Sequence, residues 1–372
     1  MKIEDLVNKG ILDLNPYQPG KPIEDLEREL GIKNAIKLAS NENPLGPSPL
    51  AIDAVTKILN GTNRYPDGNA LRLKEVLSKK FKVDINCLTI GNGSNDIIEF
   101  ITRSFLSDKD SAIYSEHAFA VYPLVVQAVG AEGIEIPARE YGHDLEEMNK
   151  AIKENTKLVF IANPNNPTGT FLSPKEIESF LDNLDRNIIV LLDQAYFDYS
   201  SFSNEDINFD LIKNYPNLII SRSFSKAYGL AGFRIGYSVS SPEIADYLNR
   251  VRQPFNANSL ALVAAEVALS DDSHLEKSLE INLDQKRVLM KGLEDLGYNC
   301  IPSEGNFISF DSNGDGQKLF EDLLNECVIV RTLGVYKMPN YLRTTIGLPE
   351  ENLIFLEKLS AISYINEFFN KF

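Results

Sequence analysis

Residues 158–193 read LVFIANPNNPTGTFLSPKEIESFLDNLDRNIIVLLD, and their pattern indicates the fold class. It begins with an apolar run at 158–162 and ends with another at 188–192, and the residues at 174–184 have the apolar spacing of an amphipathic helix. Consecutive apolar residues rich in β-branched types are typical of strands that are buried on both faces. A strand, a helix and a second strand in this order predict a right-handed crossover between parallel strands.

The same alternation of short apolar runs and longer amphipathic stretches continues on both sides of this unit, with a second helical pattern at 94–105. We therefore expect an α/β domain with a mostly parallel seven-stranded sheet that is sandwiched by helices. Its strands are expected from the runs at 87–93, 111–115, 133–138, 158–164, 187–193, 217–221 and 234–239.

The chain has 372 residues, more than one compact core usually contains, so two domains are expected. A long helical region at 260–296 leads to further strand-like runs and a last helix near 350–370, which indicates a smaller α+β domain. Asn-Pro, Pro-Gly and Lys-Pro pairs near the start favour an extended arm. The expected parts are an N-terminal arm that packs with the small domain (1–45), a large domain (46–265) and a C-terminal small domain (266–372).

Composition and charge exclude several classes of partner. A formal net charge of −16 argues against nucleic acid or an anionic membrane surface. The sequence contains neither an apolar run of membrane-spanning length nor the pattern of a signal peptide, so a cytoplasmic location is expected. The three cysteines are far apart and are expected to be free thiols, and no histidine clusters with them, so no metal site is expected.

Polar residues at the ends of the expected strands are the first candidates for a binding site, because ligands bind at the carboxyl ends of strands in open α/β sheets. Ser94 and Asn95 follow a glycine turn and open a helix, whose N-terminus can hold a phosphate; an ordinary helix cap is the alternative. Asn166 lies in a turn rich in proline and glycine, for which a purely structural role is the alternative. Asp193 ends an apolar run, where a carboxylate is costly to bury without a cationic partner.

The loop after the run at 217–221 brings together a lysine, two serines and an arginine. Lys226 can become a nucleophile toward aldehydes if its surroundings lower its pKa. Ser223, Ser225 and Arg234 could bind a phosphate dianion beside it. A solvated surface loop is the alternative for an isolated lysine. That alternative does not explain the glycine turn before Ser94, Asn166 and Asp193, which follow other strands.

The sequence resembles the fold-type I pyridoxal-phosphate aminotransferases, whose fold is aspartate-aminotransferase-like, and within them the histidinol-phosphate aminotransferases. The segment SFSKAYGLAGFRIGY is the most specific part of this resemblance. The motifs LASNENPLGPSP, NRYPDG, GNGSND, ANPNNPTG, DQAY and YLRTTIG support it, in the same order along the chain.

The resemblance implies pyridoxal 5′-phosphate as the cofactor and a role for each site residue. Lys226 would hold the cofactor as a Schiff base and shuttle a proton, Asp193 would pair with the pyridine nitrogen, and Tyr196 would hydrogen-bond the ring oxygen O3′ together with Asn166. Phe119 would stack on the ring, with a plain core aromatic as the alternative. The phosphate would be held by Ser94, Asn95, Ser223, Ser225 and Arg234.

The resemblance also implies substrate contacts and a shared site. Tyr65 would reach the cofactor phosphate of a neighbouring subunit, so that the active site is complete only in a homodimer. Arg343 and Arg331 would bind the phosphate or carboxylate of the substrate. Tyr17 and Asn43, in the N-terminal arm, would contact the substrate, although a capping role for the arm is the alternative.

The expected reaction is amino transfer from histidinol phosphate to 2-oxoglutarate. Three departures from the family pattern are Gln194, where glutamate is usual, Asn95-Asp96, where Asp-Glu is common, and the stretch at 332–340, which lacks a glycine-tyrosine-glycine turn. The last departure leaves other substrates open, so the alternatives are an aromatic amino acid aminotransferase and a related decarboxylase of phosphorylated amino acids. A non-catalytic protein of the same fold is disfavoured, because Lys226, Asp193 and Arg234 are all present.

Overall fold

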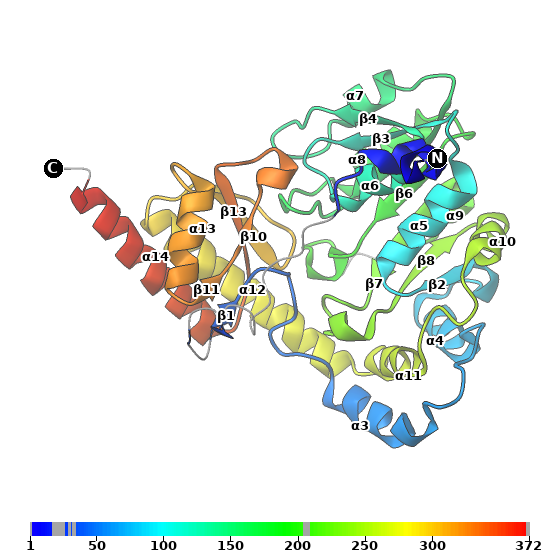
Figure 1. Cartoon of the computed structure of the whole chain (residues 1–372). Helices are drawn as coiled ribbons and strands as arrows, with labels where there is room; N and C mark the ends of the chain where they lie inside the picture. The colour runs from blue at the N-terminus through cyan, green and yellow to red at the C-terminus, as the bar shows by residue number, and fades with distance from the viewer. Residues whose placement is uncertain (1, 17–26, 29–30, 32–34, 204–208, 370–372) are drawn as a thin grey trace.

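The computed structural model describes residues 2–16, 27–28, 31, 35–203 and 209–369. Tyr17, which the sequence suggested as a substrate contact, lies outside the described residues. Figure 1 shows a larger lobe built on a broad sheet and a smaller lobe at the C-terminal end of the chain, with the long helix α12 (Asp272–Asp295) running between them. In the described part of the chain, no helix is both long enough and apolar enough to cross a membrane.

The large sheet has seven strands in the order β2-β8-β7-β6-β5-β3-β4. All neighbouring pairs are parallel except those that involve β8, which is antiparallel to β2 and to β7. Each of the seven runs expected from the sequence forms one strand. The strands are β2 (Leu88–Gly91), β3 (Ser111–Ser115), β4 (Glu132–Ile136), β5 (Thr156–Ala162), β6 (Ile189–Asp193), β7 (Leu218–Ser223) and β8 (Gly236–Ser240).

Helices cover both faces of this sheet, and alternate residues of β5 show why. Leu158 and Phe160 pack in one core with α5, α6 and α10, whereas Val159 and Ile161 pack in another with α4, α8 and α11. Burial on both faces explains the continuous apolar runs. The helices of this domain are α3 (Pro49–Ile58), α4 (Leu71–Phe81), α5 (Ser94–Phe105), α6 (Val121–Ala128), α7 (Leu145–Lys150), α8 (Pro174–Asp182), α9 (Leu211–Asn214), α10 (Pro242–Val251) and α11 (Ser259–Ala268).

The small domain packs helices on an antiparallel four-stranded sheet in the order β12-β13-β10-β9. Its core joins Leu289 of α12 and Phe355 of α14 to Phe310 and Leu342 of the sheet. Its elements are β9 (Cys300–Ile301), β10 (Phe307–Asp311), α13 (Gly316–Asn325), β11 (Val328–Ile329), β12 (Arg331–Thr332), β13 (Tyr341–Thr345) and α14 (Pro349–Phe369).

Two features differ from the expectations. The helical region at 260–296 is interrupted between α11 and α12, where the Asp271 side chain caps α12 by accepting from the His274 backbone N–H. The N-terminal arm contacts both domains: β1 (Ile36–Lys37) pairs with β11 in the small domain, whereas α1 (Lys9–Leu12) lies against α6 of the large domain. Because α12 contacts both parts of the chain, the division at residue 265 remains our proposal.

Candidate active site

The sheet topology brings several strand ends to one edge. Strands β2, β5, β6 and β7 are mutually parallel, so their carboxyl ends meet there, and the antiparallel β8 begins at the same edge. A cavity of about 270 Å³ lies at this edge, closed on its other side by β12 and β13 of the small domain. Twelve of the residues expected for the site line the cavity: Ser94, Asn95, Phe119, Asn166, Asp193, Tyr196, Ser223, Ser225, Lys226, Arg234, Arg331 and Arg343.

Lys226 follows β7, and its amine points into this cavity. Its Nζ donates a hydrogen bond to the Ser40 carbonyl oxygen at 3.0 Å and lies 5.4 Å from the centroid of the Tyr196 ring. Burial lowers the pKa of Lys226 to about 7, and the positive charge of Arg343 acts in the same direction. A large fraction of the amine is therefore neutral near pH 7, as a nucleophile toward an aldehyde requires.

Asp193 ends β6 as a buried carboxylate that is surrounded by neutral donors. It accepts hydrogen bonds from the hydroxyls of Tyr122 (2.9 Å) and Ser221 (3.1 Å) and from the backbone N–H of Ala195 (3.2 Å). Burial raises the pKa of Asp193, and these hydrogen bonds oppose the rise. Within the described residues, no salt bridge involves Asp193. A ligand with a protonated ring nitrogen would supply the missing cation.

The turn from β2 into α5 and the start of β8 form a cradle for an anion. Helix α5 begins at Ser94, and its cap residue is Gly93, which contributes no side-chain cap. Gly93 has a φ of +83°, and a Cβ built on it would lie 3.0 Å from Cζ of Arg234. Arg234 Nη1 donates to Ser225 Oγ at 3.3 Å. A helix N-terminus, a guanidinium and hydroxyls in one place suit a phosphate.

Two arginines of the small domain also line the cavity. Arg331 and Arg343 are register partners on β12 and β13, so their side chains share one face of the sheet. Arg343 is buried, and it donates hydrogen bonds to Asn166 Oδ1 and to the Ala39 carbonyl oxygen. The cavity is therefore lined by cationic groups from both domains, and guanidinium groups suit oxyanions.

Two of the expected residues lie elsewhere. Asn43 is buried, but its amide donates to the Ala227 carbonyl oxygen (2.9 Å) and to Ser278 Oγ (3.0 Å), so it ties the arm to the lysine loop and to α12. Tyr65 is 82% exposed and stacks on Phe255, with ring centroids 4.7 Å apart. Neither residue lines the cavity of this chain.

Sequence reasoning missed three residues that the fold brings to the site. Asn41 lines the cavity, and its amide donates to Tyr196 Oη at 3.1 Å; its place in the motif that contains Asn43 was the signal available. Tyr122 donates to Asp193, but it lies within an apolar helix and gave no polar pattern. Glu42 also lines the cavity and forms a salt bridge with Lys37 at 2.9 Å.

Gln194, which departs from the family pattern, faces away from the cavity toward a buried arginine. Arg222 Nε donates to Gln194 Oε1 at 3.0 Å, and its Nη1 pairs with Asp198 at 3.3 Å. The arginine also lies 4.4 Å from the centroid of the Phe197 ring. An amide oxygen at position 194 thus accepts the same hydrogen bond that a carboxylate would accept.

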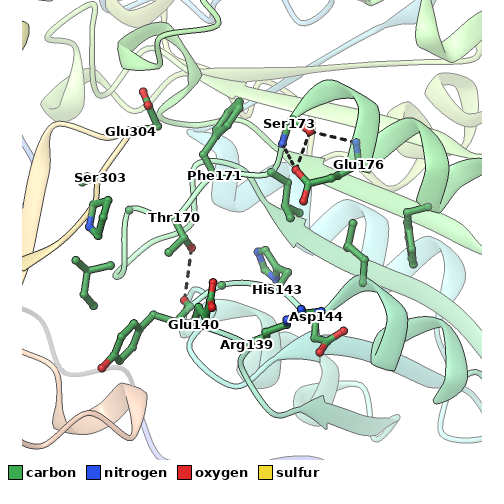
Figure 2. Close-up of a pocket in the computed structure, with 18 of the residues that line it drawn as sticks. Arg139, Glu140, His143, Asp144, Thr170, Phe171, Ser173, Glu176, Ser303 and Glu304 are labelled. Carbon is green, nitrogen blue, oxygen red and sulfur yellow. Dashed lines mark hydrogen bonds between the residues drawn. The ribbon is translucent and has the colours of Figure 1, made fainter.

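A larger groove of about 1470 Å³ lies between the two domains. Figure 2 shows Ser303 and Glu304 on its small-domain side and His143, Ser173 and Glu176 on its large-domain side. None of the residues expected for the site lines this groove. The convergence of charged groups, and not the volume, identifies the smaller cavity as the candidate active site.

Comparisons with known proteins agree with this architecture. The family described as "Aminotransferase class I and II" matches residues 33–359. A curated relative, histidinol-phosphate aminotransferase 1 of Idiomarina loihiensis, is 51% identical over 358 residues, which is 96% of this chain and 98% of the relative.

Two solved structures share the fold. Histidinol-phosphate aminotransferase from Sinorhizobium meliloti, solved with pyridoxal-5′-phosphate, has a TM-score of 0.89 at 26% identity and covers 96% of this chain and 97% of its own. A double mutant of Thermus thermophilus aspartate aminotransferase has a TM-score of 0.82 at 20% identity, and the match covers 96% of this chain and 99% of the mutant's chain. This second likeness supports the fold alone. The match along nearly the whole chain shows that this protein belongs to the class I and II aminotransferase family.

Proposed function

We propose that the protein is a pyridoxal-phosphate-dependent aminotransferase that transfers the amino group of histidinol phosphate to 2-oxoglutarate, in the cytoplasm and in histidine biosynthesis. The observation that carries the proposal is one cavity that is lined by Lys226, whose pKa is lowered to about 7, and by arginines from both domains. The 51% identical relative from Idiomarina loihiensis, a histidinol-phosphate aminotransferase by name, supports the choice of substrate.

The residues present fit the cofactor. The Gly93 turn leaves room for the Arg234 guanidinium, which with Ser94, Asn95, Ser223 and Ser225 would hold the phosphate. Asp193, buried among neutral donors, would pair with the ring nitrogen, and Tyr196 and Asn166 would contact the ring oxygen O3′. Bound pyridoxal phosphate supplies a conjugated cationic ring that accepts the electrons released at the substrate Cα.

The chain's own groups would then bind the substrate and move its proton. Arg331 and Arg343 would bind the substrate phosphate, because two guanidinium groups on one face can donate several charge-assisted hydrogen bonds. The amine-bearing carbon would then lie in the same cavity as Lys226. The neutral Nζ of Lys226 would take the proton from Cα and return it later in the reaction. Phe119, which lines the cavity, would cover the ring.

We also propose a homodimer with shared active sites. Tyr65 is 82% exposed, and Leu50, Leu59 and Phe255 are also exposed large apolar residues. The rings of Tyr65 and Phe255 stack on each other, and adjoining exposed apolar groups suit a protein interface. In the proposed dimer, Tyr65 would reach the cofactor phosphate of the other subunit.

The test is a half-reaction followed by visible absorbance of the purified, pyridoxal-phosphate-loaded protein. Histidinol phosphate added without a keto acid is expected to remove the absorbance band of the bound cofactor, and 2-oxoglutarate is expected to restore it. Phenylalanine and tyrosine serve as comparison donors. A much faster loss of the band with phenylalanine would contradict the substrate, and release of carbon dioxide without any need for a keto acid would indicate a decarboxylase.

A further inference from the structure

Asn41 is held in an unusual backbone conformation beside the candidate active site. Its φ is +54°, in the left-handed region, and its side chain is 1% exposed. Its backbone N–H donates to Thr345 Oγ1 at 2.9 Å, and its carbonyl oxygen accepts from Asn306 Nδ2 at 3.1 Å. Both partners belong to the small domain, so this domain fixes the peptide groups around Asn41.

The side-chain amide of Asn41 is oriented by a contact on each side. Its Nδ2 donates to Tyr196 Oη at 3.1 Å, and its Oδ1 faces the Thr345 hydroxyl at 3.4 Å. An amide nitrogen can only donate, so the Tyr196 oxygen is the acceptor in this pair. The Tyr196 proton must therefore be directed elsewhere.

Tyr196 keeps that proton, and both Tyr196 and Asn41 line the cavity. Burial raises the pKa of Tyr196, although Arg343 and the hydrogen bond from Asn41 oppose the rise, so the hydroxyl is neutral near pH 7. The ring is fixed edge-on against Phe307 of the small domain, with centroids 5.1 Å apart. With Asn41 occupying one side of the oxygen, the cavity is the free direction for the hydroxyl proton.

We propose that Asn41 is a positioning residue that makes the Tyr196 hydroxyl donate its hydrogen bond into the cavity. The proposal rests on the proposed function, in which the recipient is the ring oxygen O3′ of bound pyridoxal phosphate. A hydrogen bond donated to O3′ stabilises its negative charge and competes with the proton that O3′ otherwise shares with the Lys226 nitrogen. Asn41 therefore lowers the pKa at which the visible band of the bound cofactor changes, and it acts only through Tyr196.

The test substitutes Asn41→Gly, because glycine adopts a positive φ without strain and removes the amide donor without adding charge. The pKa of the visible absorbance band is measured for the loaded wild-type protein, Asn41→Gly, Tyr196→Phe and the double variant. Loss of one neutral hydrogen bond is expected to raise this pKa by about 0.5 to 1 unit in Asn41→Gly. In the Tyr196→Phe background, the same substitution is expected to have no further effect.

Asn313→Gly is the matched control. Asn313 also has a positive φ, +57°, but it is exposed and does not line the cavity. This variant is expected to leave the pKa of the band unchanged. Asn41→Asp is a second test if Asn41→Gly folds poorly. A carboxylate accepts a hydrogen bond from the Tyr196 hydroxyl and turns its proton away from the cavity, so the pKa of the visible band should rise further. Part of this rise should disappear in the Tyr196→Phe background.

An unchanged pKa in Asn41→Gly, or an equal shift with and without the Tyr196 hydroxyl, would overturn the inference. Failure of the proposed function has a different signature. A wild-type protein that does not bind pyridoxal phosphate would show no visible band at any pH, whereas a wrong role for Asn41 leaves a normal band with an unaltered pKa. A purely structural role for Asn41 would lower the melting temperature without any shift that depends on Tyr196.

Discussion

Gly93→Ala tests the anion cradle, because the structure shows which group the new methyl would displace. A Cβ at residue 93 would overlap the Arg234 guanidinium, with Cζ at 3.0 Å. Because the displaced group is the end of a flexible side chain, Arg234 can move away at little cost to folding. With a φ of +83° and a ψ of 170°, residue 93 has a backbone conformation that is almost exclusive to glycine, so the substitution is also expected to lower the stability of the protein by about 1 to 3 kcal/mol.

The larger effect is expected on cofactor binding. A charge-assisted hydrogen bond from arginine to phosphate contributes about 1.5 to 3 kcal/mol. Since about 1.4 kcal/mol corresponds to a tenfold change in affinity, Gly93→Ala should weaken pyridoxal-phosphate binding about ten- to hundredfold. The assay is a titration of the cofactor-free protein, followed by visible absorbance.

Two comparisons make this prediction specific. Pyridoxal, which lacks the phosphate, should bind Gly93→Ala and the wild-type protein equally well. Gly232→Ala is the matched control, because Gly232 lies in the same region before β8 and a Cβ there meets no atom within 4 Å. Equal affinities of Gly93→Ala and wild type for pyridoxal phosphate would refute the cradle, and an equal loss of affinity for pyridoxal would show a general effect on the site.

Three further results are expected. Burial and Arg343 lower the pKa of Lys226 to about 7. The rate at which the cofactor-free protein develops the visible band on adding pyridoxal phosphate should therefore rise about tenfold from pH 6 to pH 8 and then level off. A rate that continues to rise up to pH 10 would contradict this pKa. Asp193→Asn should keep the cofactor bound but slow transamination by about 10²- to 10³-fold in steady-state assays, and near-normal rates would exclude a role for the charge. An equal mixture of Tyr65→Ala and the inactive Lys226→Ala should recover up to about a quarter of wild-type activity, because about half of the dimers are hybrids and each hybrid contains one intact site. No recovery of activity would argue against a shared site.

The seven strands of the large sheet were predictable from the sequence for a clear reason. Strands that are buried on both faces are apolar at consecutive positions, as in β5 and β6, so they are visible as local patterns. The largely exposed strand β4 has only an alternating apolar run. The break between α11 and α12 was not predicted, because apolar spacing continues across it and the Asp271 cap depends on one local hydrogen bond. The position of α1 on α6 was also unforeseen, since a short helix can pack against any surface that the fold presents to it.

The candidate site shows the same division between local pattern and distant contact. Lys226, Asp193 and Arg234 lie next to buried strands, and parallel strands must end at one edge, so their convergence follows from order along the chain. Asn41 and Asn43 occupy similar positions in one motif, and only the packing against the small domain shows which of them faces the cavity.

The fold class and the reactive Lys226 after β7 follow from the sequence alone, because buried strands are local patterns and the order of the motifs along the chain brings them to one edge of the sheet. Only the packing of the chain sets the pKa of Lys226 and the contacts of Asp193 and Tyr196. The pKa of Lys226 falls because the fold buries the amine and places Arg343 near it. Tyr122 of α6 donates to Asp193 and Asn41 of the N-terminal arm donates to Tyr196, and no spacing along the chain indicates these two contacts.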